Sequence, residues 1–197
     1  PIPEAIRPRV RETALTMWGI YVGLRVVLTG ILCAEGMSIF DALCHTFGTM
    51  ATGGFSTWNA SVGHFQSSTI EWTLIAFMLL AGTNFNLYYM AILQQKKPGI
   101  NPLLRWFAPF YRDPEFRLYL SILAVATFLL AFSLWAEQRY GSLSETIRHA
   151  AFMSVSITTT TGFGTEDFDQ WRSFSRVLLF GLMFVGGCAG STAGGIK

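Results

Sequence analysis

Three long apolar segments constrain this chain more than any other feature of its sequence. Residues 14–34, 69–93 and 118–137 are predominantly hydrophobic, and each has the roughly 20 residues that an α-helix needs to cross ~30 Å of hydrocarbon. The chain of 197 residues is 51% hydrophobic and 13% charged, whereas an average soluble domain is roughly 25% charged. Because lipid offers no partners to backbone polar groups, these segments must be helical. The sequence predicts an all-α membrane protein.

Two shorter segments follow the first and the third crossing. Residues 38–50 begin with Ser38, a candidate N-cap, and carry apolar groups at helical spacing. Residues 142–157 place Glu145 in the first turns, where an acid suits the helix dipole. A helix of about 13 residues spans only ~20 Å. We therefore expect two re-entrant pore helices that enter the membrane without crossing it.

A short motif follows each pore helix, and its two copies are 108 positions apart. The first filter loop, residues 51–56, contains T-G-G-F, and the second, residues 158–164, contains T-T-G-F-G. This is the pattern of potassium-channel filters, whose successive carbonyls replace the hydration shell of the ion. The glycine before the phenylalanine permits backbone angles that other residues adopt poorly. The predicted potassium-binding residues, acting mainly through their carbonyls, are Thr52, Gly53, Gly54, Thr160, Thr161 and Gly162.

The order of these segments forms an internal repeat, written M1-P-M2 for crossing, pore helix and second crossing. Residues 1–97 form the first pore repeat and residues 98–117 a linker. Residues 118–197 form the second pore repeat, whose second crossing lies within residues 171–197. The predicted fold is a tandem of potassium-channel-like repeats with re-entrant pore helices and filter loops.

A glycine-rich loop, residues 186–195, interrupts the last crossing. Only nine apolar residues, 177–185, precede it, so the helix extends ~13 Å, to about mid-bilayer. Irregular backbone at that depth is tolerated only where it is buried in protein or lines water. We therefore expect this loop beneath the filter, where it can act as a gate. The candidate gate residues are Gly186, Gly187, Gly190, Ser191, Thr192, Gly194 and Gly195.

Two other interpretations of this loop are weaker. A phosphate-binding loop requires lysine directly after its second conserved glycine, and here Ile196 separates Gly195 from Lys197. Helix packing through small residues explains spaced glycines but fits the paired ones poorly.

The distribution of basic residues predicts the orientation. Residues 1–13 and 94–117 together carry eight Lys and Arg, whereas residues 34–71 carry none and residues 137–176 carry four. The positive-inside rule places residues 1–13 and 94–117 in the cytoplasm and the filter loops outside. The net charge of +2 is too small to indicate a nucleic-acid partner.

Other polar residues leave alternatives open. Arg25, within a predicted crossing, is either a functional charge or a residue that snorkels to the interface or pairs with a neighbouring helix. Glu166, Asp167 and Asp169 form either an anionic vestibule that concentrates cations or a solvated loop. The cysteines show no spacing typical of a metal site or disulfide and are interpreted as small buried apolar residues: Cys33, Cys44 and Cys188. The histidines show no ligand spacing and are interpreted as ordinary polar positions: His45, His64 and His149.

The motifs at residues 51–57, 158–163 and 186–197 together resemble the Trk/Ktr/HKT superfamily of potassium transporters and, within it, the bacterial TrkH-type subunits. The resemblance covers essentially the whole chain. It implies four M1-P-M2 repeats around one pore, of which this chain supplies the second and third. It also implies a multi-pass protein of the cell inner membrane, a homodimer of the full-length protein, and a TrkA-like cytoplasmic ring that binds nucleotides and regulates the pore.

The resemblance also implies roles for the motif residues. The carbonyls of residues 52–53 and 160–161 coordinate potassium, and the glycines at 54 and 162 favour potassium where serine accompanies sodium permeation.

Two rival hypotheses assign the chain to functional classes other than ion transport. An intramembrane enzyme could use Ser191 or Thr192 as nucleophile, although no suitable base is near in the sequence. A non-conducting membrane scaffold would use the glycines for packing.

Overall fold

The computed structural model describes residues 6–94 and 102–196, and over these residues it is entirely helical apart from loops. Residues 1–5 of the predicted N-terminal flank and residues 95–101 of the predicted linker region lie outside the described part. The helices are α1 (Ile6–Ala34), α2 (Ile39–Met50), η1 (Ser61–Phe65), α3 (Ser68–Ala81), α4 (Phe85–Gln94), α5 (Pro102–Arg112), α6 (Pro114–Ala136), α7 (Leu143–Thr158), η2 (Phe168–Gln170) and α8 (Ser173–Leu182).

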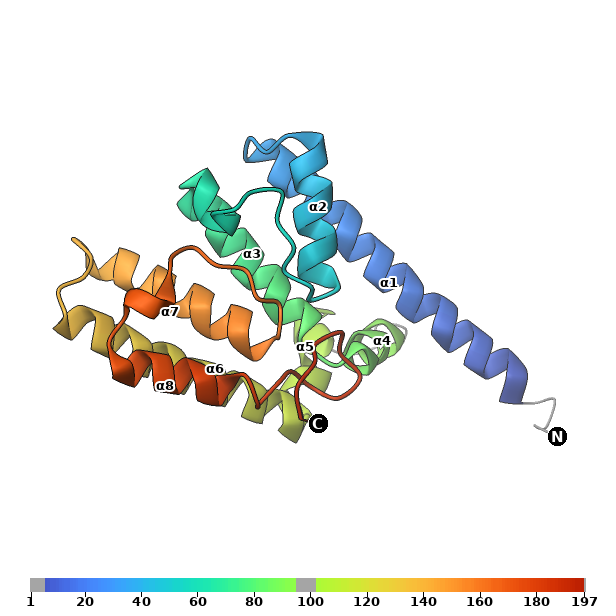
Figure 1. The fold of residues 1–197 in the computed structure, drawn as a ribbon. Coiled ribbons are helices and arrows are strands. Elements are labelled where there is room, and N and C mark those ends of the chain that lie inside the picture. The colour runs from blue at the N-terminus through green and yellow to red at the C-terminus, as the bar shows by residue number, and fades with distance from the viewer. Residues whose placement is uncertain (1–5, 95–101, 197) are drawn as a thin grey trace.

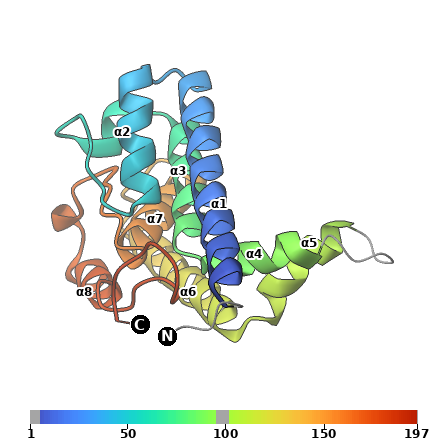
Figure 2. The same cartoon turned by 90° about the vertical axis from the view of Figure 1, so that its right-hand side faces the viewer.

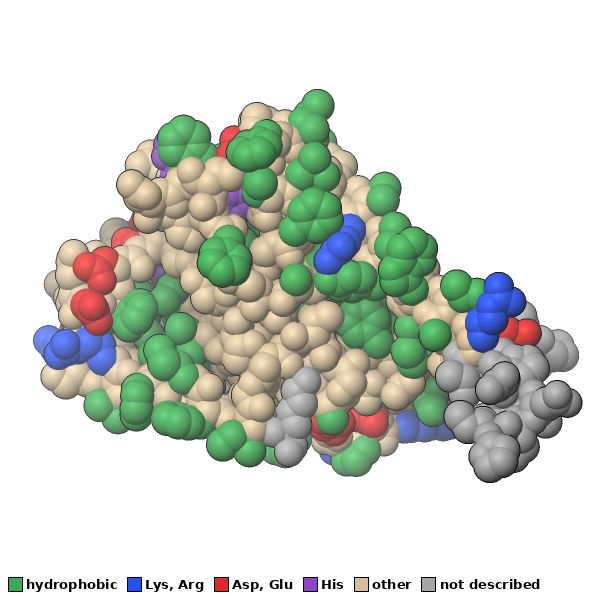
Figure 3. Space-filling view, turned by 45° about the vertical axis from the view of Figure 1, so that its right-hand side comes forward, with side chains coloured by type: hydrophobic (Ala, Val, Ile, Leu, Met, Phe, Trp, Pro, Cys, Tyr) green, Lys and Arg blue, Asp and Glu red, His purple; other side chains and the backbone are tan. Residues whose placement is uncertain are grey.

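Two helices of the described residues are long and apolar enough to cross a membrane: α1 over Arg11–Ala34, and α6. In Figure 1, α1 extends away from the other helices toward the N-terminus. Large apolar side chains such as Trp18, Val26 and Phe128 are exposed on these helices, and Figure 3 shows hydrophobic side chains at many places on one face, among backbone and other side chains. A surface of this kind suits lipid, so the prediction of an all-α membrane protein is confirmed.

The two short helices α2 and α7 begin alike. The Ser38 hydroxyl accepts a hydrogen bond from the Asp41 N–H (3.1 Å), and the Ser142 hydroxyl accepts one from the Glu145 N–H (3.2 Å). Such caps satisfy one of the unpaired N–H groups at a helix start. Helix α2 packs beside α1 (Figure 2), whereas α7 packs against α3 and α6. Each short helix therefore lies next to a helix long enough to span a membrane.

The region of the predicted crossing at residues 69–93 differs from the expectation. It consists of two helices, α3 and α4, bent by 85° at residues 82–84. The physical reason lies far along the chain: Cys188 donates its N–H to the Gly82 carbonyl (2.9 Å), and Phe85 donates its N–H to the Gly190 carbonyl (3.1 Å). The glycine-rich loop thus satisfies backbone groups that the broken helix leaves unpaired.

The predicted linker at residues 98–117 also contains helical structure. Helix α5 occupies most of it, and α6 begins directly afterwards with Asp113 as N-cap and Pro114 in its first turn. The Asp113 carboxylate accepts a hydrogen bond from the Phe116 N–H (2.7 Å). Aromatic residues of α5 pack on neighbours, with Phe110 against Tyr88 of α4 at 5.5 Å between ring centroids. The segment is therefore folded against α4 and α6.

Candidate functional site

The two predicted filter loops leave their helices through the same hydrogen bonds. In the first loop, the N–H groups of residues 53–54 both donate to the Gly48 carbonyl (2.8 and 3.3 Å). In the second, those of residues 161–162 both donate to the Ser156 carbonyl (2.9 and 3.2 Å). The donors and the acceptors are both 108 positions apart. The repeated sequence therefore forms a repeated backbone.

The same correspondence holds for backbone angles. Thr52 and Thr160 have φ of 50° and 56°, and Gly54 and Gly162 have φ of 62° and 85°. Positive φ is open to glycine but is uncommon for a β-branched residue such as threonine. Strain of this kind persists only where the surrounding structure imposes it, and it clusters at functional sites.

The two filter loops lie side by side. A side chain added at Gly54 would overlap the Thr161 carbonyl, so the absence of a Cβ at Gly54 allows the loops to approach. Beyond the motifs, Gly63 donates its N–H to the Gly164 carbonyl (3.2 Å), and Gly164 donates its N–H to the Ser61 hydroxyl (3.3 Å). The structure thus brings the two candidate ion-binding segments together, although they are 108 residues apart.

The glycine-rich loop contacts the first threonine of each filter motif. The Thr52 hydroxyl donates to the Thr192 carbonyl (2.9 Å), and the Gly194 N–H donates to the Thr160 hydroxyl (2.7 Å). In Figure 1 this C-terminal loop passes close to the ends of α3 and α7. The loop that contains the predicted gate residues is therefore in direct contact with both predicted filter loops.

Within the loop, the glycines are required by close approach of the backbone to itself. Gly186, Gly190 and Gly195 have φ of 75°, 73° and 96°. A Cβ at Gly186 would overlap the Gly194 carbonyl. At Gly187 it would lie 2.6 Å from the Ala193 side chain. Helix packing through small residues does not account for these contacts, because they lie within the loop itself.

The two hydroxyls of the rival enzyme hypothesis are engaged with backbone. Ser191 donates to the Cys188 carbonyl (2.6 Å), and the Thr192 hydroxyl donates to the Ala81 carbonyl (3.0 Å). A nucleophilic hydroxyl needs to give its proton to a base. Both hydroxyl protons are instead directed to carbonyl oxygens, an arrangement that stabilises the turn.

Two of the acidic residues after the second filter loop, Glu166 and Asp167, have partners close to them in the sequence or in the fold. Tyr140 donates its phenol hydrogen to the Glu166 carboxylate (2.6 Å), and Arg139 pairs with the same carboxylate at 3.6 Å. Burial and the neighbouring Glu166 raise the pKa of Tyr140, so the phenol stays protonated as a donor. Asp167 accepts from the backbone N–H of Asp169 (3.1 Å). These contacts partly neutralise the predicted vestibule and favour the solvated-loop interpretation.

Three charged residues within apolar segments have defined partners: Arg25, Glu71 and Arg148. The Arg25 guanidinium lies 4.0 Å from the Tyr21 ring centroid and 4.9 Å from that of Phe47 on α2, and it also donates to the Tyr21 hydroxyl. This favours pairing with a neighbouring helix. Arg148 on α7 donates to the buried Glu71 carboxylate on α3 (2.8 Å). Sequence reasoning missed this second pair, although opposite charges in two apolar segments are a usable signal.

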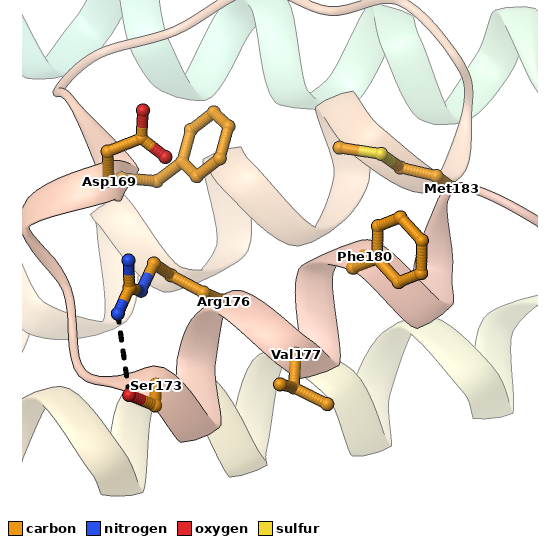
Figure 4. A pocket seen from close by; sticks show the side chains of 7 residues that line it. Asp169, Ser173, Arg176, Val177, Phe180 and Met183 are labelled. Carbon is orange, nitrogen blue, oxygen red and sulfur yellow. Dashed lines mark hydrogen bonds between the residues drawn. The ribbon is translucent and has the colours of Figure 1, made fainter.

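A groove of about 350 Å³ lies away from these motifs, between α8 and η2 (Figure 4). At one end Arg176 donates to the Ser173 hydroxyl (3.4 Å) and lies near Asp169, and at the other end are Phe180 and Met183. Its lining contains none of the predicted filter or gate residues. The groove therefore belongs to the outer surface of α8 and not to the candidate ion path.

The chain is similar to known proteins over nearly its whole length. Residues 4–197 match the TrkH family, described as cation transport protein. The chain is 41% identical over 192 residues to the Trk system potassium uptake protein TrkH of Escherichia coli (strain K12), an alignment that covers 98% of this chain and 38% of that protein. It is 34% identical over 194 residues to TrkG of the same organism, again over 38% of the relative.

A solved structure is also similar. The potassium transporter TrkH from Vibrio parahaemolyticus superposes with a TM-score of 0.87 and 37% sequence identity, over 95% of this chain and 38% of that one. The chain thus spans about 38% of the length of the relatives that it matches.

Proposed function

Because this chain belongs to the TrkH family of cation transport proteins, we propose that it forms part of the conduction path of a potassium uptake protein. The family match confirms the resemblance that the filter and loop motifs indicated, and it places the chain among membrane transporters and not among enzymes. The relatives are named as potassium uptake proteins, and potassium is accordingly the proposed ion.

The side-by-side filter loops carry this proposal. Potassium sheds its water and binds the carbonyls of residues 52–53 and 160–161, with Gly54 and Gly162 setting the backbone angles. Helices α2 and α7 both end at these loops. Their C-terminal dipole ends favour a cation there. Both threonines with positive φ are fixed by the same loop, so the carbonyls are held before the ion arrives.

The glycine-rich loop is proposed as the gate beneath the filter. It contacts both filter threonines and packs on the break between α3 and α4. Its opening requires the hydrogen bonds at Thr52 and Thr160 to break. Channel-like conduction would then be controlled by an element within the membrane.

The complete protein is proposed to contain two further M1-P-M2 repeats, with this chain as the second and third of four. The proposal includes a homodimer in the cell inner membrane and a TrkA-like nucleotide-binding ring on the cytoplasmic side. Residues 1–13 and 94–117 would face that ring, and the filter loops would face outside.

The filter assignment is tested by Gly162→Ser in the full-length protein, reconstituted in liposomes. We expect the preference for potassium over sodium to fall, because serine at a φ of 85° strains the loop. Gly141→Ser is the matched control, since Gly141 has open space around it and no positive φ. Unchanged selectivity in Gly162→Ser would contradict the filter assignment, and absence of any potassium flux in the unmodified protein would favour the scaffold alternative.

The gate assignment is tested by deleting part of residues 187–194. We expect potassium flux to rise even when the proposed nucleotide-binding ring is absent from the assay, because the loop no longer lies beneath the filter. A deletion that leaves flux unchanged in a correctly folded protein would leave the loop with a structural role alone.

A further inference from the structure

Two buried histidines lie directly behind the filter loops. His45 on α2 has no exposed surface and His149 on α7 is 6% exposed. Each is hydrogen-bonded to a hydroxyl that follows a filter motif: Ser56 in the first repeat and Thr165 in the second. A buried imidazole with a defined partner at each of two repeated loops indicates a common task.

In the first repeat, the hydrogen bonds assign the proton on the ring. His45 Nδ1 lies 2.7 Å from the Asp41 carbonyl, and because a carbonyl only accepts, Nδ1 carries the hydrogen. In the neutral ring Nε2 then accepts from the Ser56 hydroxyl (2.9 Å). The Ser56 oxygen in turn accepts from the Trp58 N–H (3.1 Å). Every polar atom of this chain of contacts has a partner.

In the second repeat, a histidine at the position equivalent to Asp41, one turn earlier on the pore helix, makes a similar contact with Thr165, the equivalent of Thr57. His149 Nδ1 lies 3.0 Å from the Thr165 hydroxyl. The His149 ring stacks on Tyr140 with 4.7 Å between centroids, and Tyr140 donates to Glu166, the residue after Thr165. The outer end of the second filter loop is therefore bonded to His149 on α7 and to Tyr140 in the loop that precedes α7.

These contacts give each filter loop two attachment points on its own pore helix. The inner point is the carbonyl of Gly48 or Ser156, which accepts two loop N–H groups. The outer point is the histidine. Only Phe55 lies between the two points in the first loop, and only residues 163–164 in the second, so both attachments hold the chain directly after the carbonyls of residues 52–53 and 160–161. Ion discrimination depends on the number and geometry of coordinating carbonyls.

We infer that His45 and His149 are positioning residues that hold the outer ends of the two filter loops and thereby set the preference for potassium over sodium. The imidazoles bond to Ser56 and Thr165, the His45 ring also stacks on Phe163 of the second loop, and neither imidazole is proposed to touch the ion. This inference rests on the proposed function. The sequence did not reveal the pair, because the two histidines precede their hydroxyl partners by different separations, 11 and 16 residues.

The test uses the full-length protein in liposomes, with potassium and sodium fluxes measured separately. His45→Ala and His149→Ala are each expected to lower the potassium-to-sodium flux ratio roughly fivefold, the factor that corresponds to one net hydrogen bond, while potassium flux persists. His64→Ala is the matched control, because His64 is exposed and its ring stacks on the Trp58 ring (3.7 Å between centroids), whereas the hydroxyls of Ser56 and Thr165 are bonded to the other two histidines. Its ratio is expected to stay unchanged.

Removal of the hydroxyl partners tests the same attachment with smaller changes. Ser56→Ala and Thr165→Val are also expected to lower the ratio, and the double variant His45→Ala with Ser56→Ala is expected to lose no more than His45→Ala alone. Where a histidine variant does not fold, the hydroxyl variants decide. Unchanged ratios in folded Ser56→Ala and Thr165→Val overturn the inference.

The outcomes separate this inference from the proposed function. Unmodified protein without selective potassium flux contradicts the proposed function. Selective flux in the unmodified protein, together with equal selectivity in the four variants, contradicts only the role of the histidines.

Discussion

The two filter loops share a backbone and differ in their surroundings. Phe163 of the second loop is 1% exposed, stacks on His45 at 5.5 Å between centroids, and lies against Gly48 of α2. Phe55 of the first loop is 83% exposed. Gly54 touches the second loop, whereas Gly162 has open space around it. The motif thus fixes its own conformation, and the neighbouring repeat determines what its side chains contact.

One position on the pore helices accounts for part of this difference. Ser156 donates its hydroxyl to the Phe163 carbonyl (2.7 Å). The equivalent residue of the first repeat is Gly48, and a Cβ there would lie 2.9 Å from the Phe163 ring. The glycine on the first helix therefore leaves space for the aromatic ring of the second filter loop. The two equivalent positions both contact Phe163: Ser156 bonds to its carbonyl, and Gly48 lies against its ring.

The largest expected effect is at the contact between the loops. Gly54→Ala places a methyl group into the Thr161 carbonyl, so we expect loss of correctly folded protein in size-exclusion chromatography. Gly162→Ala meets no neighbour in the described residues and strains only its own φ, which costs about 1–2 kcal/mol. Equal losses in the two variants would contradict the difference between the loops.

The aromatic residues provide the next test. Phe163→Ala removes a buried ring and is expected to cost about 3–5 kcal/mol, measured as thermal stability in detergent. In the full-length protein we expect Phe55→Ala to cost a similar amount, because under the proposed four-repeat arrangement a further repeat covers Phe55. A negligible loss at Phe55 would mean that no other repeat packs there.

The hydroxyl of Ser156 is expected to matter less. Ser156→Ala leaves the buried Phe163 carbonyl without its donor and should cost about 1–3 kcal/mol, with a reduced potassium-to-sodium flux ratio. Ser154→Ala is a useful comparison, because Ser154 is on the same helix and equally buried but bonds to Thr127 (2.7 Å) and not to the filter. A similar change in selectivity for both variants would argue against a specific role of Ser156.

The smallest expected effect concerns how the thermal stability of the protein depends on Asp41 at low pH. Hydrogen bonds from Thr57 and Ser38 lower the pKa of Asp41 below its ordinary value of 3.8. The ionised form therefore stabilises the first loop at every pH above 3.8, and that contribution is lost as the pH falls through the lower folded value. Thermal stability of Asp41→Asn should be lower than that of the unmodified protein at neutral pH, and the gap should close only below pH 3.8. A gap that closes near pH 6 would exclude Asp41 as its cause.

Features set by local sequence could be predicted. The helices at residues 39–50 and 143–158 agree with the expected pore helices to within one residue, because a serine cap and apolar spacing define each of them. The two loops share hydrogen bonds and φ values because the same residue types recur at the same spacing.

Features set by contacts between distant segments could not be predicted. The composition of residues 69–93 indicates one apolar helix, and the bend appears only because a loop more than 100 residues later supplies its hydrogen bonds. The burial of Phe163 and the histidine contacts likewise join residues whose separation in sequence carries no periodic signal.

The bend between α3 and α4 has a consequence for biosynthesis. The carbonyls of Ala81 and Gly82 and the N–H of Phe85 take their partners from residues 188–192. While the ribosome is still translating the second repeat, those partners do not yet exist. The nascent first repeat must therefore leave these groups to water or hold the segment as a straight helix, and it can adopt its final shape only after the C-terminal loop has emerged.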